Sequence, residues 1–223
     1  MQSEGEKWLA QKLQETFGIE SDPDPLVLIQ NAENYLKTEL EKLGYFFLGG
    51  RTLPYWGPYI YARQENLDYL VELSEGVEPV RVVFMHDFHC MGWQNFATMG
   101  HVGTGGWAKE DALYCVASKW NREHDDFLIH YLKHEAQHKR DLRCFPQLKH
   151  DQETMEYRAK LSELIYSQNI NTLKRFVAEA NPDSNAPHSR ASAKIAQKLS
   201  LDWDIPAIQS RSRELLFESS GAL

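Results

Sequence analysis

A chain of 223 residues with 42% hydrophobic side chains is long enough for one domain with a substantial core. Its formal net charge is −8, and no run of basic residues forms a patch, which excludes the basic surface that nucleic-acid phosphates require. No segment approaches the roughly 20 apolar residues of a membrane-spanning helix, so we expect no membrane span.

The cysteines and the N-terminus both bear on localisation. Cys90, Cys115 and Cys144 form an odd and sparse set, which is typical of reduced thiols rather than of a disulfide framework. The first residues lack the basic start and the apolar run of a secretory signal. Together these features predict a cytoplasmic protein.

The order of the predicted elements indicates the fold class. Two amphipathic stretches, Glu4–Phe17 and Leu26–Leu43, open the chain and are separated by a break rich in Asp and Pro. Strand-like segments follow between residues 45 and 116, and helical patterns dominate from residue 121 to the end. This order predicts an α+β protein. We expect a single domain over residues 1–223, with a sheet-containing lobe (1–120) and a helical lobe (121–223).

Two features of the strand region could serve function. The apolar run Val80–His89 predicts a strand, and we interpret His86 and His89 as polar residues at its end rather than as a second metal site, since residues three apart on a strand point to opposite faces. The glycine-rich segment Thr104–Ala108 precedes a second apolar run, Leu113–Ala117. It is either an edge strand or an ordinary hairpin turn.

The next helical segment carries an HExxH sequence formed by His134, Glu135 and His138. Residues 121–133 contain no Gly or Pro and have apolar side chains at helical spacing, so the motif falls late in an amphipathic helix. Residues four apart share one face of a helix, and both imidazoles can therefore reach the same metal ion. His130 would extend this row, but we expect it to be a partly buried neighbour, because one tetrahedral ion does not bind three histidines in a row.

This spacing predicts metal-activated hydrolysis. Bound zinc lowers the pKa of its water ligand to about 7, and a neighbouring carboxylate can accept the proton as that water attacks a carbonyl. Glu135, directly after the first histidine, is the expected general base. We therefore predict a zinc-dependent (Zn2+) hydrolase.

A catalytic zinc site usually has three protein ligands and one open position, so a third ligand is required. The helical pattern over Asp151–Ser167 offers Glu156, followed one turn later by the small Ala159. Glu153 lies one turn earlier on nearly the same face and is the rival ligand. We favour Glu156 on motif spacing.

With these residues the chain resembles the gluzincin group of zinc metallopeptidases, in which HExxH is followed by a second helix carrying a glutamate, often as ExxA. Glu156-Tyr157-Arg158-Ala159 matches that form, and the resemblance covers roughly residues 121–168. It implies a zincin-like fold with the active-site cleft between the sheet-containing and helical lobes. It also implies that an edge strand, for which Thr104–Ala108 is the candidate, binds an extended peptide through its main chain.

The sequence departs from related patterns at three positions. Lys160 stands where the ExxxD form of the motif has Asp, so a carboxylate that orients a zinc histidine would come from Asp141 or Asp151. In the metzincin pattern position 141 is Gly and position 144 is His. Here they are Asp141 and Cys144, and we set that assignment aside.

Transition-state stabilisation requires a donor from outside the motif helix, and Tyr166 and His188 are the candidates. The leading prediction is a zinc metallopeptidase that acts on a peptide or protein substrate. The alternative is a catalytically inactive zincin-like metal-binding or interaction module, for which the aromatic side chains could form a ligand groove. An intact Glu135 favours the enzyme.

Overall fold

Burial alternates along parts of the two long strands at the centre of the chain. Residues 4–49, 51–52, 55–109 and 111–221 are described in this computed structural model. In β5, Val80 and Val82 are buried while Arg81 between them is exposed, as a strand with one covered face requires. β4 (Tyr59–Leu73) and β5 (Gly76–Met91) are joined by a two-residue turn.

The strands belong to two sheets. The larger sheet has the order β1-β4-β5-β7-β6, which makes β6 an edge strand, and β2 and β3 form a separate antiparallel pair. β6 pairs antiparallel with β7 from Gly106 opposite Cys115 to Ala108 opposite Leu113. The shorter strands are β1 (Phe46–Leu48), β2 (Arg51–Thr52), β3 (Tyr55–Trp56), β6 (Gly106–Ala108) and β7 (Leu113–Val116).

The chain divides into two units, which β4 and β5 both traverse. The first unit is Met1–Glu65 with Phe84–Gly105, and the second is Asn66–Val83 with Gly106–Leu223. In the first, α1 (Glu4–Phe17) packs on α2 (Pro25–Lys42) through a small core around Ala10 and Ile29, and α3 (Gly92–Ala97) follows β5.

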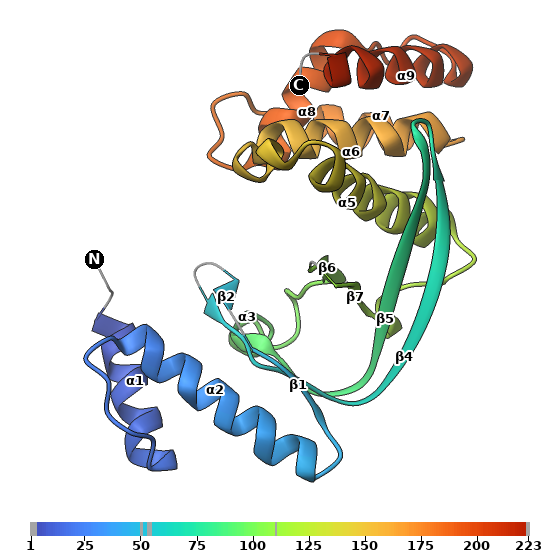
Figure 1. Cartoon of the computed structure of the whole chain (residues 1–223). Helices are drawn as coiled ribbons and strands as arrows, with labels where there is room; N and C mark the ends of the chain where they lie inside the picture. Colours follow the sequence, from blue (N-terminus) through green and yellow to red (C-terminus); the bar gives the residue numbers. More distant parts are fainter. Residues whose placement is uncertain (1–3, 50, 53–54, 110, 222–223) are drawn as a thin grey trace. The chain divides into compact units, whose positions relative to one another are not determined.

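The second unit contains the helices that carry the HExxH residues and Glu156. α6 contacts α5 as well as α8 and α9, and its apolar side chains enter the main helical core with Phe176 and Ile195 (Figure 1). The helices of the second unit are η1 (Ala117–Lys119), α4 (Asp125–Phe127), η2 (Leu128–Lys133), α5 (His134–Cys144), η3 (Pro146–His150), α6 (Gln152–Tyr166), α7 (Asn171–Glu179), α8 (Pro187–Lys198) and α9 (Ile205–Gly221).

The predicted α+β class is confirmed, since strands dominate the middle of the chain and helices its C-terminal part. Within the described ranges, no helix combines the length and the apolar character needed to cross a membrane. The zincin-like architecture and the single catalytic domain remain predictions.

Candidate metal centre

One nearly continuous helical run carries the HExxH residues. It begins at Asp125, where the His124 side chain accepts a hydrogen bond from the backbone of Asp126, and passes through the π-helix η2 into α5. α5 starts at His134 and ends at Cys144, just before the proline of η3. The π-helical turn thus lies directly before the motif. Such turns are rare and are often found at functional sites.

α6 brings the glutamate of the second motif to this helix. Asp151 caps its N-terminus: Oδ1 accepts from the backbone N–H of Thr154 at 3.0 Å, and Oδ2 accepts from the Thr154 hydroxyl at 2.7 Å. Asp151 is therefore a capping residue and does not orient a histidine of the site. Ala159, one turn after Glu156, is completely buried, and its small side chain permits the close approach of α5 and α6.

Three predicted ligands converge between these two helices. His134, His138 and Glu156 are all buried, with exposed fractions of 8%, 9% and 8%. The Nε2 atoms of the two histidines are 3.1 Å apart. Nε2 of His134 lies 3.5 Å from Oε2 of Glu156, and Nε2 of His138 lies 3.5 Å from Oε1. Within the part of the chain that is described, this is the one group of His, Cys, Asp or Glu residues close enough to hold a metal ion.

The spacing of these atoms fits a tetrahedral metal ion. Bonds of roughly 2.0–2.1 Å around a tetrahedral zinc place its ligand atoms about 3.3 Å apart, close to the separations observed. Oε2 of Glu156 is buried and has no hydrogen bond of acceptable geometry among the described residues. Two imidazoles and one carboxylate are also a donor set that zinc uses in catalytic sites. The three residues present therefore fit the ion that the sequence implies.

Glu163 is a functional residue that the sequence analysis missed. Its Oε1 lies 2.7 Å from Nδ1 of His134, and its Oε2 lies 2.7 Å from Nδ1 of His130 and 2.6 Å from an Arg175 nitrogen. A proton held on Nδ1 of His134 by this carboxylate leaves the lone pair of Nε2 directed at the cluster. The available signal was spacing, because Glu163 follows Glu156 by two helical turns and so shares its face.

Asp141, the other predicted orienting carboxylate, serves a different purpose. Its two oxygens accept from the guanidinium of Arg158 at 2.8 and 2.9 Å, and both side chains are fully buried. Asp141 is thus part of a structural ion pair, and Glu163 takes the role that we assigned to Asp141 or Asp151. His130 is a partly buried neighbour that bonds Glu163, as expected.

The structure also separates the rival third ligand from the cluster. Glu153 forms ion pairs with Arg190 at 2.5 Å and Lys194 at 2.6 Å. Both cations lower its pKa, and its carboxylate is occupied by these partners rather than by the histidines. Glu156 is the glutamate that α6 presents to the motif helix.

Unusual protonation accompanies the cluster when no metal is bound. Burial alone would lower the pKa of His134, but the neighbouring carboxylates of Glu156 and Glu163 raise it to about 10. Burial acts to raise the pKa of Glu163, yet His130, His134 and Arg175 hold it at about 2. The pKa of Glu156 is likewise lowered by its histidine neighbours against the effect of burial. A metal ion would therefore replace a proton held between acidic groups.

Glu135 is half-buried on α5 directly after His134. Its negative charge contributes to the raised pKa values of both His134 and Tyr131, which places the carboxylate near these two residues. Among the described residues it forms no hydrogen bond or ion pair. The carboxylate is thus free to act on a bound water, and its catalytic role stays a prediction.

The two predicted transition-state donors have different surroundings. His188, in the first turn of α8, has its Nδ1 2.9 Å from Oε2 of Glu156, and its ring is nearly parallel to that of His134. Tyr166 is ten residues after Glu156 on α6, a rise of about 15 Å. Its ring lies 3.7 Å from Lys133 Nζ, and burial raises its pKa. The structure brings His188 to the cluster and leaves Tyr166 away from it.

The remaining candidates do not join the cluster. Within the first unit, Nε2 of His86 is 3.8 Å from Glu65, and the His89 ring packs edge-on against Tyr45. Among described residues no second metal-binding group forms around them. Cys144 is exposed at the end of α5.

The predicted edge segment lies beside the motif helix. Gly106–Ala108 of the Thr104–Ala108 candidate forms β6, the edge of the sheet. A Cβ at Gly106 would be 2.3 Å from the carbonyl oxygen of Tyr114 and 2.7 Å from the hydroxyl of Tyr131, so only glycine permits this approach. The Tyr131 hydroxyl donates to the Tyr114 carbonyl oxygen at 2.9 Å and joins η2 to β7.

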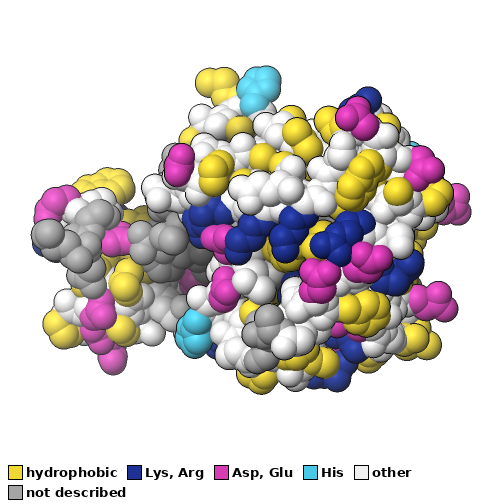
Figure 2. Space-filling view, turned by 90° about the horizontal axis from the view of Figure 1, so that it is seen from above, with side chains coloured by type: hydrophobic (Ala, Val, Ile, Leu, Met, Phe, Trp, Pro, Cys, Tyr) yellow, Lys and Arg dark blue, Asp and Glu magenta, His cyan; other side chains and the backbone are white. Residues whose placement is uncertain are grey.

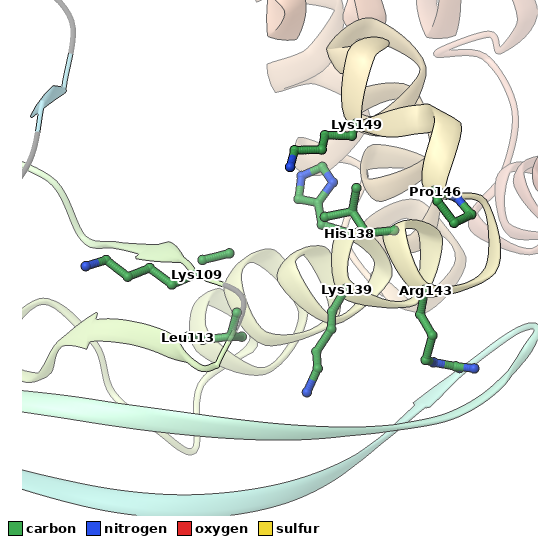
Figure 3. A pocket seen from close by; sticks show the side chains of 9 residues that line it. Lys109, Leu113, His138, Lys139, Arg143, Pro146 and Lys149 are labelled. Atoms are coloured by element: carbon green, nitrogen blue, oxygen red, sulfur yellow. The ribbon is translucent and has the colours of Figure 1, made fainter.

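A cavity of about 560 Å³ opens between this edge and α5 (Figure 3). It has the size of a small-ligand or side-chain pocket. His138, a predicted metal ligand, is part of its wall. The lining residues are Ala108, Lys109, Leu113, His138, Lys139, Leu142, Arg143, Pro146 and Lys149.

In comparisons with known proteins, no family model, curated protein or solved structure matches this chain.

Proposed function

We propose that this chain is a zinc-dependent hydrolase of the metallopeptidase type, similar to the gluzincins. The observation that carries the proposal is the convergence of His134, His138 and Glu156 at tetrahedral spacing. Glu135, a half-buried carboxylate that forms no ion pair with any described residue, follows the first of these ligands. A purely structural site has no need of such a base.

Each side chain then has a defined task. Zinc, when bound by the three ligands, supplies a Lewis acid and a water of lowered pKa. Glu135 accepts the proton of the attacking water at its carboxylate. Glu163 fixes the His134 ring through Nδ1, which keeps Nε2 available. His188, which is mostly exposed and lies beside Glu156, would donate a hydrogen bond to the oxygen that becomes negative.

The edge strand supports a peptide as the substrate. β6 is the last strand in the sheet order and borders the cavity that His138 lines. An extended peptide added to that edge would hydrogen-bond through its main chain. The carbonyl groups of the bound peptide would then lie beside the metal ligands.

The test compares hydrolysis of a quenched fluorescent peptide pool by zinc-loaded wild type and by Glu135→Gln. We expect the variant to retain zinc and to lose hydrolysis by about 10²–10⁴-fold, because general-base catalysis contributes that much. Glu123→Gln, a change at an exposed glutamate of the preceding turn, is the matched control and should be as active as wild type. Equal rates in wild type and Glu135→Gln would contradict the proposed mechanism.

One contact favours a second candidate, an inactive metal-binding module. Nδ1 of His188 is close enough to Glu156 that His188 could act as a fourth protein ligand, and closed four-ligand sites are structural. His188→Ala separates the two functions. For the enzyme, zinc affinity changes little and turnover falls; for a closed site, zinc affinity falls sharply.

A further inference from the structure

Four helices of the second unit meet at the carboxylate of Glu163. This residue lies on α6, His134 on α5, His130 on η2 and Arg175 on α7. At the surface, side chains of opposite charge adjoin: on the face in Figure 2, Lys and Arg side chains form a row with Asp and Glu side chains beside it. Glu163 differs from these because it is only 3% exposed. A buried carboxylate requires hydrogen-bond donors, and those donors also set its orientation.

The two oxygens of Glu163 are divided between different donors. Oε1 lies 2.7 Å from Nδ1 of His134, a predicted metal ligand. Oε2 lies 2.7 Å from Nδ1 of His130 and 2.6 Å from a guanidinium nitrogen of Arg175. Although burial acts to raise it, the pKa of Glu163 is held at about 2 by these three neighbours. The carboxylate can therefore only accept, and each Nδ1 is the donor.

Packing alone would not fix this division of the oxygens. The last torsion of a glutamate side chain is broad and nearly two-fold, so the carboxylate plane can turn unless its partners hold it. His130 and Arg175 both donate to Oε2, one from η2 and the other from α7. A hydrogen bond between a guanidinium and a carboxylate is among the stronger kinds. Their joint effect is to leave Oε1 directed at His134.

The His130 ring is also held on its other side. Its Nε2 lies 3.5 Å from the hydroxyl of Thr172, whose oxygen lies 2.7 Å from Oγ of Ser167. Both hydroxyl side chains are buried. The chain of contacts thus runs from the start of α7 through His130 and Glu163 to His134. α7 takes part in it without supplying a predicted metal ligand.

We propose that His130 and Arg175 are positioning residues of the metal centre, which together clamp Oε2 of Glu163 so that Oε1 holds the His134 ring with Nε2 directed at the metal. The inference rests on the proposed function for the identity of the metal site. It requires no reaction at that site. Metal binding alone can therefore test it.

The test compares variants that remove a donor with variants that retain one. His130→Leu and Arg175→Met remove a donor to Oε2, whereas His130→Asn keeps an amide nitrogen near the place of Nδ1 and Arg175→Lys keeps the charge. Zinc affinity is measured by competition with a chelator. We expect the first two variants to bind zinc about three- to tenfold more weakly, at or below the low end of the roughly 10–100-fold effect of losing an outer partner, because Glu163 itself remains. The two conservative variants should bind within about twofold of wild type, since each retains a donor to Oε2.

A cobalt spectrum adds a readout that a merely stabilising residue would not change. Co2+ binds the same nitrogen and oxygen donors as zinc, and its visible absorption depends on how the ligands are arranged. We expect the bands of cobalt-loaded His130→Leu and Arg175→Met to shift from those of wild type, because the His134 ring would be free to turn. The bands of His130→Asn and Arg175→Lys should match those of wild type.

Arg143→Met is the matched control. The Arg143 side chain is 56% exposed and lies 2.7 Å from the buried Glu78, while that of Arg175 is 50% exposed and lies 2.6 Å from Glu163. Both changes therefore take an exposed arginine away from a buried glutamate, and they should lower stability in urea unfolding to a similar extent. Only Arg175→Met should alter zinc affinity and the cobalt bands.

Equal zinc affinities and equal cobalt bands in wild type, His130→Leu and Arg175→Met would overturn the clamp, and so would changes of the same size in Arg143→Met. A wild type that binds neither metal would remove the clamp together with the proposed function. Hydrolysis is measured separately. If the variants bind metal as expected but wild type cleaves no peptide, the clamp stands and only the hydrolase is removed.

Discussion

Glu163 is the carboxylate that would orient a histidine of the proposed metal centre. Its side chain is almost completely buried, and its two oxygens lie within hydrogen-bonding distance of His134, His130 and Arg175. Of these, only His134 is a predicted ligand. Outer carboxylates of this kind fix the orientation of the metal-bound ring and raise its basicity.

Replacement of Glu163 by Gln should therefore weaken zinc binding by about 10–100-fold without removing a ligand. The measurement is competition with a chelator of known affinity. Glu153→Gln is the matched control, because Glu153 is on the same helix but pairs with Arg190 and Lys194. If both variants bound zinc as tightly as wild type, Glu163 would have no part in the centre.

The protonation of His134 predicts opposite pH dependences with and without metal. The metal-free pKa of about 10 exceeds the ordinary 6.5, so the proton stabilises the fold fully below 6.5 and that contribution is lost as pH rises through 10. The lowered pKa of Glu163, about 2, contributes stability above its ordinary 4.5 that is lost as pH falls through 2. Between pH 6 and 8.5 only the first effect operates.

We therefore expect the urea midpoint of chelator-treated protein to fall from pH 6 to pH 8.5. The added stability conferred by zinc should rise over the same interval, because the metal displaces the proton on His134. His134→Ala should flatten both trends. A zinc effect that is larger at pH 6 than at pH 8.5 would contradict the arrangement.

At the scale of elements, the edge strand depends on one glycine. Gly106 lets β6 approach Tyr114 and Tyr131 more closely than any residue with a Cβ. Gly106→Ala should destabilise the second unit by at least about 1 kcal/mol, because backbone must shift to relieve the overlap. Substrate binding should weaken with little change in zinc content. Gly221→Ala has no atom within 4 Å of the new Cβ and provides the control in urea unfolding.

Helices were the most predictable elements. The sequence predicted a helix over Glu4–Phe17, and α1 has those bounds; the predicted Asp151–Ser167 differs from α6 by one residue at each end. Periodicity and Pro or Asp signals are local, and they suffice for such elements. The run expected from residue 121 begins only at Asp125, because Asn121 and His124 make side-chain turns to the backbone first.

The site was predictable where its geometry lies within one helix and less so between helices. HExxH spacing is a property of α5 alone, and the structure brings Glu156 to it as expected. The orienting carboxylate depends on how α5 and α6 cross, which spacing along the chain does not show, so Asp141 and Asp151 were predicted instead of Glu163. His188 reaches Glu156 from a third element, α8. Tyr166 shares a helix with Glu156 but is too many turns away.

At the largest scale, a buried charge network joins α5 and α6 to other elements of the second unit. Arg158, which is fully buried, bonds Asp141 of α5, Glu75 in the turn between β4 and β5, and the C-terminal residues of α9. Asp141 follows His138 by less than one turn. The network therefore links the position of the ligand helix to elements distant in sequence.

Arg158→Met should cost about 3–5 kcal/mol in the free energy of unfolding, because the carboxylate of Asp141 would be left buried without its counter-ion. Arg211→Met removes an arginine that pairs with the exposed Glu214 and Glu218, and should change stability by less than about 1 kcal/mol. Urea unfolding at pH 7 measures both. Similar small effects in the two variants would show that the network is not needed for stability.

Metal analysis of the purified chain tests the central claim most directly. Wild type, His134→Ala, Glu156→Ala and the control Glu153→Gln would be loaded with zinc, desalted and analysed for metal content. We predict about one zinc ion per chain in wild type and in the control, and little in the two ligand variants. Absence of zinc from wild type, or zinc retained equally in all four proteins, would contradict a metal centre at His134, His138 and Glu156.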